Sequence, residues 1–274
     1  MKKIAVLLVV IFTFMGCSKH TTSFMSFNIR YDNKNDQENW WGHRKGDVVA
    51  QIKDYDPDFL GIQEGLHHQV EYLSKQLSSY QFVGKGRDDG KQKGEYSAIF
   101  YKDQKFTLLK TATFWLSTTT DTVSVGWDAA LPRIATYGQF ENKRSGEHIY
   151  VFNTHFDHLG KVARKKSAEL ILQKIKEFGL EHKKVVVMGD LNAVPGEDPI
   201  EVFRKEMYDG FSFSSFSGPK GTFNAFKKDE ISDKRIDYIF TKNLEQKTYK
   251  HIDTKRPNGL WVSDHLAVYV EAFF

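Results

Sequence analysis

Val185-Val186-Val187-Met188-Gly189-Asp190-Leu191-Asn192 combines an apolar run with two polar residues, and it predicts both a buried strand and a candidate site at the end of that strand. Its four leading apolar residues are typical of a short strand that is buried on both faces. Asp190 and Asn192 lie two positions apart, so their side chains point to the same side of an extended chain. Taken alone, the stretch fits an ordinary strand followed by an Asp/Asn turn equally well.

The rest of the chain alternates strand-like and helix-like segments, which is the rhythm of an α/β protein. Apolar patterns predict strands at 24–31, 58–64, 96–101, 106–116, 134–141, 148–156, 235–240 and 266–273. Helical spacing predicts helices at 44–55, around Val70, Leu73 and Leu77, and at 161–178. Turn residues between 142 and 146 predict a hairpin, and residues 211–225 a long loop. We find no long linker after residue 23, so we expect one domain at 24–274.

The composition is that of a globular chain with a mild positive charge. The 274 residues are 40% hydrophobic and 27% charged, which excludes an intrinsically disordered chain. The formal net charge of +4 suits a phosphate-bearing substrate, but it is well short of a polycationic chain. The single cysteine, Cys17, precedes the predicted domain, so neither an intrachain disulfide nor a cysteine-based zinc site is expected.

The first residues have the pattern of a bacterial signal peptide. Lys2 and Lys3 precede an apolar run from Ile4 to Met15, which is too short for a membrane span of about 20 residues. The following Phe14-Met15-Gly16-Cys17 is similar to a lipobox, in which the cysteine receives a lipid. We therefore expect a lipoprotein signal peptide at 1–17, a tether at 18–23 and a protein anchored at the cell envelope, on its periplasmic or surface side. An ordinary signal peptide is the alternative.

Polar residues fall repeatedly within or at the ends of strongly apolar strands. A carboxylate in such a place costs free energy unless it is paired, hydrogen-bonded or bound to a metal. One such residue would carry little information, but the set predicts that the strand ends converge on one site. Its members are Asn28, Glu64, His155, Asp157, Asp190, Asn192, Asp237, Asp264 and His265.

These residue types have the chemistry of phosphoester hydrolysis. Glu64 offers a hard oxygen ligand of the kind that magnesium or manganese prefers. Asp190 can take a proton from an attacking water, with Asn192 beside it to position water or phosphate. His155 and His265 can donate hydrogen bonds to the non-bridging phosphate oxygens.

The same segments resemble the endonuclease/exonuclease/phosphatase superfamily, which includes DNase I and exonuclease III-like nucleases. In the family's order, the matching segments are Ser26–Arg30, Gln63-Glu64, Thr154–His158, Gly189–Asn192, Arg235–Ile239 and Ser263–His265. The resemblance spans essentially all of residues 23–274. It implies an α/β (α+β) fold, a DNase I-like four-layer sandwich of two packed, mostly antiparallel sheets flanked by helices.

The resemblance also implies a role for each matching residue. It places Glu64, Asn28 and Asp264 at the metal, Mg²⁺ or Mn²⁺, and makes Asp190 the base that activates water. It makes Asn192, His155 and His265 phosphate-binding residues, with Asp237 behind His265.

Two further residues match the family less closely. Glu95 occupies the place of the acid that supports the first histidine, and Arg133 resembles an arginine that contacts the substrate phosphate. A structural or exposed position is the alternative for both.

The resemblance implies a divalent-metal-dependent phosphoester hydrolase. Our first hypothesis is a phosphodiesterase or nuclease in which water attacks the phosphorus in line. The alternative is a phosphomonoesterase for a small sugar phosphate, nucleotide or inositol phosphate, and a remote one is a phosphate-binding protein without turnover. The expected partners are therefore a nucleic acid or a small phosphorylated metabolite, and a membrane through a lipid on Cys17. The sequence implies no protein partner.

Other polar residues have ordinary interpretations. Arg164, Lys165 and Lys166 on the helix at 161–178 fit a solvated face, with phosphate steering as the alternative. We expect Asp157 to support its own loop and His251 to lie at the surface.

Overall fold

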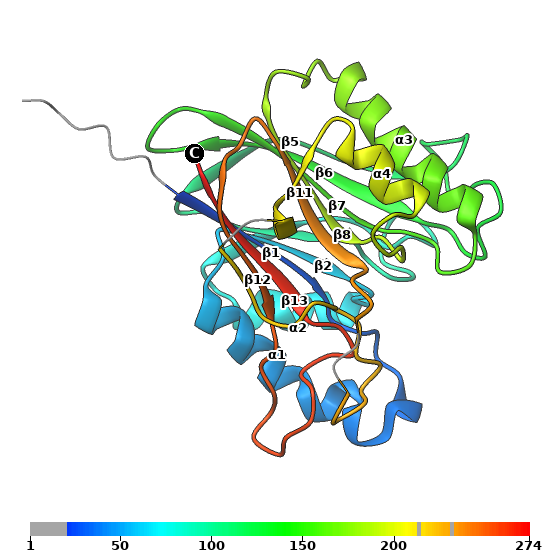
Figure 1. Ribbon diagram of the computed structural model, residues 1–274, viewed down its shortest axis with the longest axis vertical. Coiled ribbons are helices and arrows are strands. Elements are labelled where there is room, and N and C mark those ends of the chain that lie inside the picture. Colours follow the sequence, from blue (N-terminus) through cyan, green and yellow to red (C-terminus); the bar gives the residue numbers. More distant parts are fainter. Residues whose placement is uncertain (1–20, 213–214, 231–232) are drawn as a thin grey trace, which may run out of the picture.

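The computed structural model describes residues 21–212, 215–230 and 233–274. The predicted signal peptide, with Cys17, lies outside these residues. Two β-sheets pack face to face, and helices cover their outer faces (Figure 1). Within the described residues, no helix is both long and apolar enough to cross a membrane.

The first sheet has seven strands in the order β10-β12-β13-β1-β2-β4-β3. Neighbouring strands are antiparallel except for β10 with β12 and β1 with β2, which run parallel. The strands are β1 (Thr21–Asn28), β2 (Phe59–Gln63), β3 (Tyr80–Val83), β4 (Ile99–Lys102), β10 (Phe216–Ser217), β12 (Gln246–Ile252) and β13 (Ala267–Phe273).

The second sheet has six strands in the order β5-β6-β7-β8-β11-β9. Only β7 and β8 are parallel neighbours, and this parallel pair puts the ends of both strands at one edge. The strands are β5 (Phe106–Trp115), β6 (Ile134–Asn142), β7 (His148–His155), β8 (Lys184–Asp190), β9 (Tyr208–Asp209) and β11 (Asp237–Lys242).

The helices form the two outer layers. The first pair, α1 (Trp41–Tyr55) and α2 (His67–Gln76), packs on the first sheet, whereas α3 (Lys161–Glu177) and α4 (Asp198–Arg204) pack on the second. Short 3-10 helices, η1 (Lys34–Asn39) and η2 (Gly210–Ser212), lie in the connections. Three apolar cores result, one under each helix pair and one between the sheets.

The apolar run of β8 is buried on both faces, as its sequence predicts. Val185 and Val187 belong to the core under α3 and α4, whereas Val186 and Met188 belong to the core between the sheets. Alternate side chains of a strand point to opposite faces, so one strand contributes to both layers. The predicted two-sheet sandwich flanked by helices is confirmed, and so is the hairpin, formed by β6 and β7.

Several local expectations differ from the structure. β1 begins at Thr21, so residues 21–23 of the expected tether already belong to a strand. The strands β3 and β12 and the helix α4 were not expected, and the loop at 211–225 contains β10. His251, expected at the surface, is 0% exposed because β12 turns it inward against Phe211.

Candidate active site

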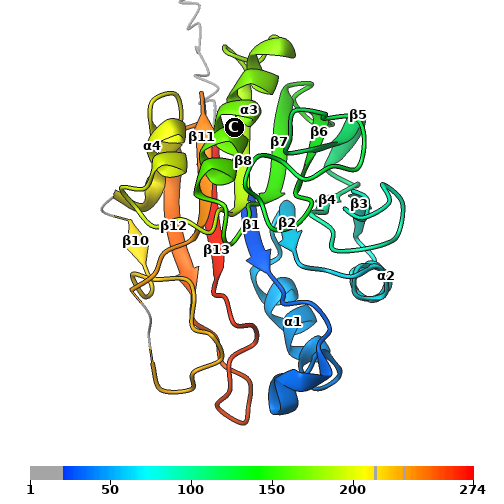
Figure 2. The same ribbon diagram turned by 90° about the vertical axis from the view of Figure 1, so that its right-hand side faces the viewer.

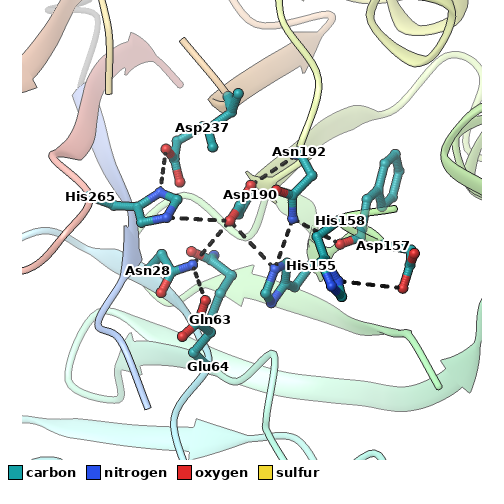
Figure 3. A network of polar contacts seen from close by, with 12 residues as sticks. Asn28, Gln63, Glu64, His155, Asp157, His158, Asp190, Asn192, Asp237 and His265 are labelled. Carbon is teal, nitrogen blue, oxygen red and sulfur yellow. Dashed lines mark hydrogen bonds and ion pairs between the residues drawn. The ribbon is translucent and has the colours of Figure 1, made fainter. Parts of the chain in front are cut away.

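Strands of both sheets end at the same edge and bring the predicted residues together (Figures 2 and 3). His155 at the end of β7 is the register partner of Asp190 at the end of β8. Asp190 is in turn opposite Asp237 at the start of β11. In the first sheet, Asn28 ends β1 beside β2, which leads directly into Glu64.

Asp190 lies at the centre of the cluster. Its Oδ1 accepts a hydrogen bond from the backbone N–H of Asn192 at 2.9 Å, and its Oδ2 accepts one from Nδ2 of Asn28 at 3.0 Å. The Nε2 atoms of His155 and His265 lie 3.4 and 3.8 Å from the same Oδ2. Burial, and then the charge of Asp237, raise the pKa of Asp190 to about 7.

The backbone around Asp190 is held in conformations that few residues adopt. Gly189 has a φ of +153°, and a β-carbon there would lie 2.0 Å from the carbonyl oxygen of Thr154 on β7. Only glycine lets the two strands approach this closely. Asn192 and Glu64 have φ values of 47° and 63°, which are unusual for residues other than glycine and typical of functional sites.

Glu64 and Asn28 form the link between the two sheets. Nδ2 of Asn28 donates to Oε1 of Glu64 at 3.0 Å as well as to Asp190, and Oε2 of Glu64 accepts from the backbone N–H of Tyr31 at 3.1 Å. Oδ1 of Asn28 accepts from the backbone N–H of Arg30. Asn28 therefore orients both carboxylates with its amide nitrogen, and ligation of a metal through its oxygen would require the amide to turn over.

Asp264 and Arg30 lie on the same side of the site as Glu64. Oδ2 of Asp264 lies 3.8 Å from Nε of Arg30, and Nη1 of Arg30 lies 3.9 Å from Oε2 of Glu64. Burial raises the pKa of Asp264, and the nearby charge of Glu64 adds to this effect. Arg30 is fixed from behind by two hydrogen bonds to Asp36. No role for Arg30 was predicted from the sequence; it follows the end of β1 and has a φ of 57°.

His265 is bound to Asp237. Its Nδ1 lies 2.9 Å from Oδ2 of Asp237, which fixes the ring and leaves Nε2 on the side of Asp190. Burial alone lowers the pKa of His265, but the charges of Asp237 and Asp190 raise it well above its usual value. His265 is therefore a cation with an N–H at both ring nitrogens.

His155 differs from His265 in its protonation state. Burial, and then the charges of Arg133 and Arg87, lower its pKa well below the usual value, so the ring is neutral. Nδ2 of Asn192 lies 3.1 Å from Nε2 of His155 and donates to it. A neutral imidazole has one donor and one acceptor nitrogen, so the proton of His155 is on Nδ1.

Glu95 lies beside His155, where the resemblance implied it, without a direct hydrogen bond to the ring. Its Oε2 lies 3.7 Å from Nδ1 of His155, beyond hydrogen-bond distance. Both of its oxygens accept hydrogen bonds from Arg87 instead, at 2.7 and 2.9 Å. Burial raises the pKa of Glu95, although Arg87 opposes the shift. The buried guanidinium of Arg87 thus competes for the carboxylate, a partner that sequence spacing did not reveal.

Arg133 reaches the site on the side of the loop after β7. Its Nε donates to Oδ2 of Asp157 at 3.3 Å, and its Nη2 lies 3.1 Å from Nδ1 of His158. Among the described residues, its buried Nη1 has no hydrogen-bond partner. Asp157 also accepts from the backbone N–H groups of Leu159 and Gly160, which confirms that it supports its own loop.

These side chains line one cleft of about 690 Å³. Of the predicted site residues, Asn28, Asp157 and Asp237 do not line the cleft, and the others do. The cleft is lined by Arg30, Tyr31, Glu64, Glu95, Leu131, Arg133, His155, His158, Arg164, Asp190, Asn192, Val194, Glu197, Phe223, Lys234, Ile236, Asp264 and His265. The cleft-lining residues that were not predicted from the sequence lie mainly on loops, whose sequences have no periodic pattern.

The donor set fits a divalent cation. One ligand atom from each of Glu64, His155 and Asp190 lies within 4.8 Å of the others. Repulsion between buried acids contributes to the raised pKa values of Asp190 and Asp264. A bound dication would relieve this repulsion, and carboxylate oxygens suit magnesium or manganese.

Phosphoester hydrolases of the DNase I-like fold combine a two-sheet sandwich of this kind with a cleft of acids and histidines. The chain belongs to the endonuclease/exonuclease/phosphatase family, whose model matches residues 25–265.

Solved structures of bacterial family members are similar over nearly the whole chain. An endonuclease/exonuclease/phosphatase from Bacteroides vulgatus is 39% identical, with 93% of this chain and 99% of that chain covered and a TM-score of 0.88. A family protein from Bacteroides thetaiotaomicron is 35% identical, with 93% and 98% covered and a TM-score of 0.88. A mannosyl-6-phosphatase from the same species is 35% identical, with 92% and 100% covered and a TM-score of 0.87.

Proposed function

We propose that the protein is a divalent-metal-dependent phosphomonoesterase that acts on a small phosphorylated sugar. The observation that carries this proposal is the convergence of Glu64, Asp190 and His265 from separate strand ends into one compact cleft. The likeness to a mannosyl-6-phosphatase supports the choice of substrate class.

A metal ion, Mg²⁺ or Mn²⁺, would be held by the carboxylates of Glu64 and Asp264, with Asn28 beside them. When bound, it would polarise a phosphoryl oxygen and offset the negative charge that develops during hydrolysis. Both carboxylates line the cleft, and Asn28 already orients Glu64 through a 3.0 Å hydrogen bond.

Asp190 is the group that we assign as the general base. Its two hydrogen bonds, from Asn192 and Asn28, fix the carboxylate while it remains within the cleft. A pKa of about 7 lets it exist as a base at neutral pH and still hold a proton taken from water.

Hydrogen-bond donors around Asp190 would bind the phosphate group of the substrate. The His265 cation presents Nε2–H on the side of Asp190, where it can donate to a phosphate oxygen. Asn192 lines the cleft beside His155, and a phosphate oxygen can replace the nitrogen of His155 as acceptor for its amide. Arg133 adds a fixed positive charge, with Nη1 left for the substrate.

The cleft suits a compact monoester better than a nucleic acid. A volume of about 690 Å³ lies within the range of small-molecule sites, about 300–1,000 Å³. A nuclease needs a basic groove that follows several phosphates, whereas this cleft is lined by acids such as Glu95 and Glu197 as well as by arginines.

The test is a substrate panel. Phosphate release is measured from mannose 6-phosphate and p-nitrophenyl phosphate, beside hydrolysis of bis-p-nitrophenyl phosphate and plasmid DNA, with magnesium, manganese or EDTA. We expect turnover of the monoesters with either metal and none with EDTA. Turnover of DNA and the diester without the monoesters would overturn the proposal in favour of a nuclease.

Metal binding is measured without turnover by thermal unfolding. A ligand that binds only the folded state raises the melting temperature. We expect magnesium to raise it for the wild-type protein and to do so much less for Glu64→Gln. Glu71→Gln, an exposed substitution on α2, is the matched control. An equal shift in all three proteins would place the metal elsewhere.

We also propose that a lipid on Cys17 holds the enzyme at the cell envelope. The basis is the apolar run that ends in Gly16-Cys17. Cells that express the full chain with labelled palmitate should incorporate the label into wild-type protein and not into Cys17→Ala. Equal labelling of both proteins would exclude this anchor.

A further inference from the structure

The cleft has a second polar wall that the proposed hydrolysis does not use. This wall contains Arg164 from the first turn of α3 and Glu197 from the loop before α4. The loop continues directly from Asn192, so the wall adjoins the phosphate end of the cleft. We propose that Glu197 and Arg164 form the subsite for the sugar hydroxyl groups of the substrate, an inference that rests on the proposed phosphatase function.

Both side chains are held in place from behind. Arg164 is only 6% exposed, and its Nη1 donates to the carbonyl oxygen of Asp157 at 3.1 Å. Oε2 of Glu197 accepts from the backbone N–H of Val194 at 2.8 Å. Fixed side chains lose little conformational freedom when they bind a ligand, which suits a specificity site.

The two side chains leave a gap that fits one hydroxyl group. Nη2 of Arg164 lies 3.9 Å from Oε1 of Glu197, too far for a direct hydrogen bond. A hydroxyl oxygen can lie about 2.8 Å from both atoms, accept from the guanidinium and donate to the carboxylate. Among the described residues, Nε of Arg164 also has no hydrogen-bond partner.

Arg164 and Glu197 carry opposite charges, so the wall has no net positive charge to attract a second phosphate. The Glu197 carboxylate offsets the attraction of Arg164 for a phosphate and can accept hydrogen bonds from a neutral polyol. The pair therefore favours a sugar carrying one phosphate over a nucleotide chain. The hydrogen bonds of Arg164 to Asp157 and of Val194 to Glu197 hold the two side chains in place. These bonds use Nη1 of Arg164 and Oε2 of Glu197, and not the two atoms that face each other, Nη2 and Oε1.

The test is a ratio of two substrates measured on the same enzyme. Mannose 6-phosphate carries hydroxyl groups, whereas p-nitrophenyl phosphate carries none on its leaving group. In Glu197→Gln, which keeps an acceptor for the N–H of Val194, we expect the ratio of their kcat/KM values to fall about ten-fold, as for the loss of a charged hydrogen-bond partner. Glu197→Ala should lower the ratio at least as much.

Glu201→Gln on α4 is the matched control, because Glu201 is exposed and pairs with Arg204. Its ratio should equal that of the wild type. An unchanged ratio in both Glu197 variants would overturn the subsite, even if the kcat/KM values for the two substrates fell together. A wild type that hydrolyses p-nitrophenyl phosphate but no sugar phosphate would also overturn it. A wild type inactive on every monoester would overturn the phosphatase proposal itself, and the subsite with it.

Discussion

Oδ2 of Asp237 lies 2.9 Å from Nδ1 of His265, and this contact fixes the imidazole with Nε2 on the side of Asp190. Asp237 is held at the start of β11, where its backbone N–H donates to Oγ1 of Thr222 at 3.1 Å. Asp237 does not line the cleft, so it acts on the substrate indirectly, through its contact with His265 and through its charge, which raises the pKa of Asp190.

Asp237→Asn tests this relationship. The amide cannot stabilise the imidazolium as a carboxylate does, so we expect kcat to fall about 10²-fold, with a smaller change in KM. The pKa of His265, followed by NMR, should fall in the variant. Asp253→Asn, in the exposed segment after β12, is the control. Unchanged kcat and an unchanged His265 pKa would contradict the assigned role.

Gly189→Ala tests the close approach of β7 and β8. The new methyl group would lie 2.0 Å from the carbonyl oxygen of Thr154, and the φ of +153° is unfavourable for alanine. We expect the free energy of unfolding to fall by about 3 kcal/mol. Denaturant unfolding measures the change.

Gly46→Ala is the matched substitution for comparison. Gly46 lies within α1, with nothing within 4 Å of an added β-carbon. This variant should gain about 0.5–1 kcal/mol, because alanine is the better helix former. If both alanine variants unfolded at the same denaturant concentration, the proposed contact with Thr154 would be wrong.

His251 makes stability depend on pH. Burial lowers its pKa from 6.5 to about 4 in the folded protein, so the unfolded chain binds a proton more readily. The contribution of neutral His251 to the free energy of unfolding is therefore fully present above pH 6.5. It is lost progressively as the pH falls from 6.5 through about 4. A shift of this size corresponds to about 3 kcal/mol.

The measurement compares unfolding of the wild type and His251→Gln between pH 7 and pH 4. Glutamine does not titrate, and its amide can replace the imidazole as partner of the carbonyl oxygen of Pro219. The variant should lose less stability than the wild type over this range. Parallel curves would show that His251 is not buried in the neutral form.

The sequence predicted elements best where one chemical feature dominates. The run Val185–Met188 predicted a doubly buried strand because every residue is apolar, and Asp190 and Asn192 then had to lie at its end. The strand β12 was missed because Gln246–Ile252 mixes charged and apolar residues without clear alternation. Its position depends on pairing with β13, which is distant in the sequence.

Side-chain partners were the least predictable feature of the site. Glu95 lies beside His155 as expected, but the sequence did not predict that Arg87 binds both of its oxygens. Arg164 fitted a solvated helix face with its neighbours, yet it is buried because the loop after β7 folds over it. Charge alone does not distinguish these cases, since an arginine with carbonyl and carboxylate partners can be buried.

The most direct test of the account is the rate of phosphate release from mannose 6-phosphate, with saturating magnesium, by the wild type and Asp190→Asn. Asparagine keeps the shape and the hydrogen bond from Asn192 but cannot accept a proton from water. We expect kcat to fall about 10³-fold in this variant, with the fold and magnesium binding retained. Wild-type turnover by Asp190→Asn would contradict it.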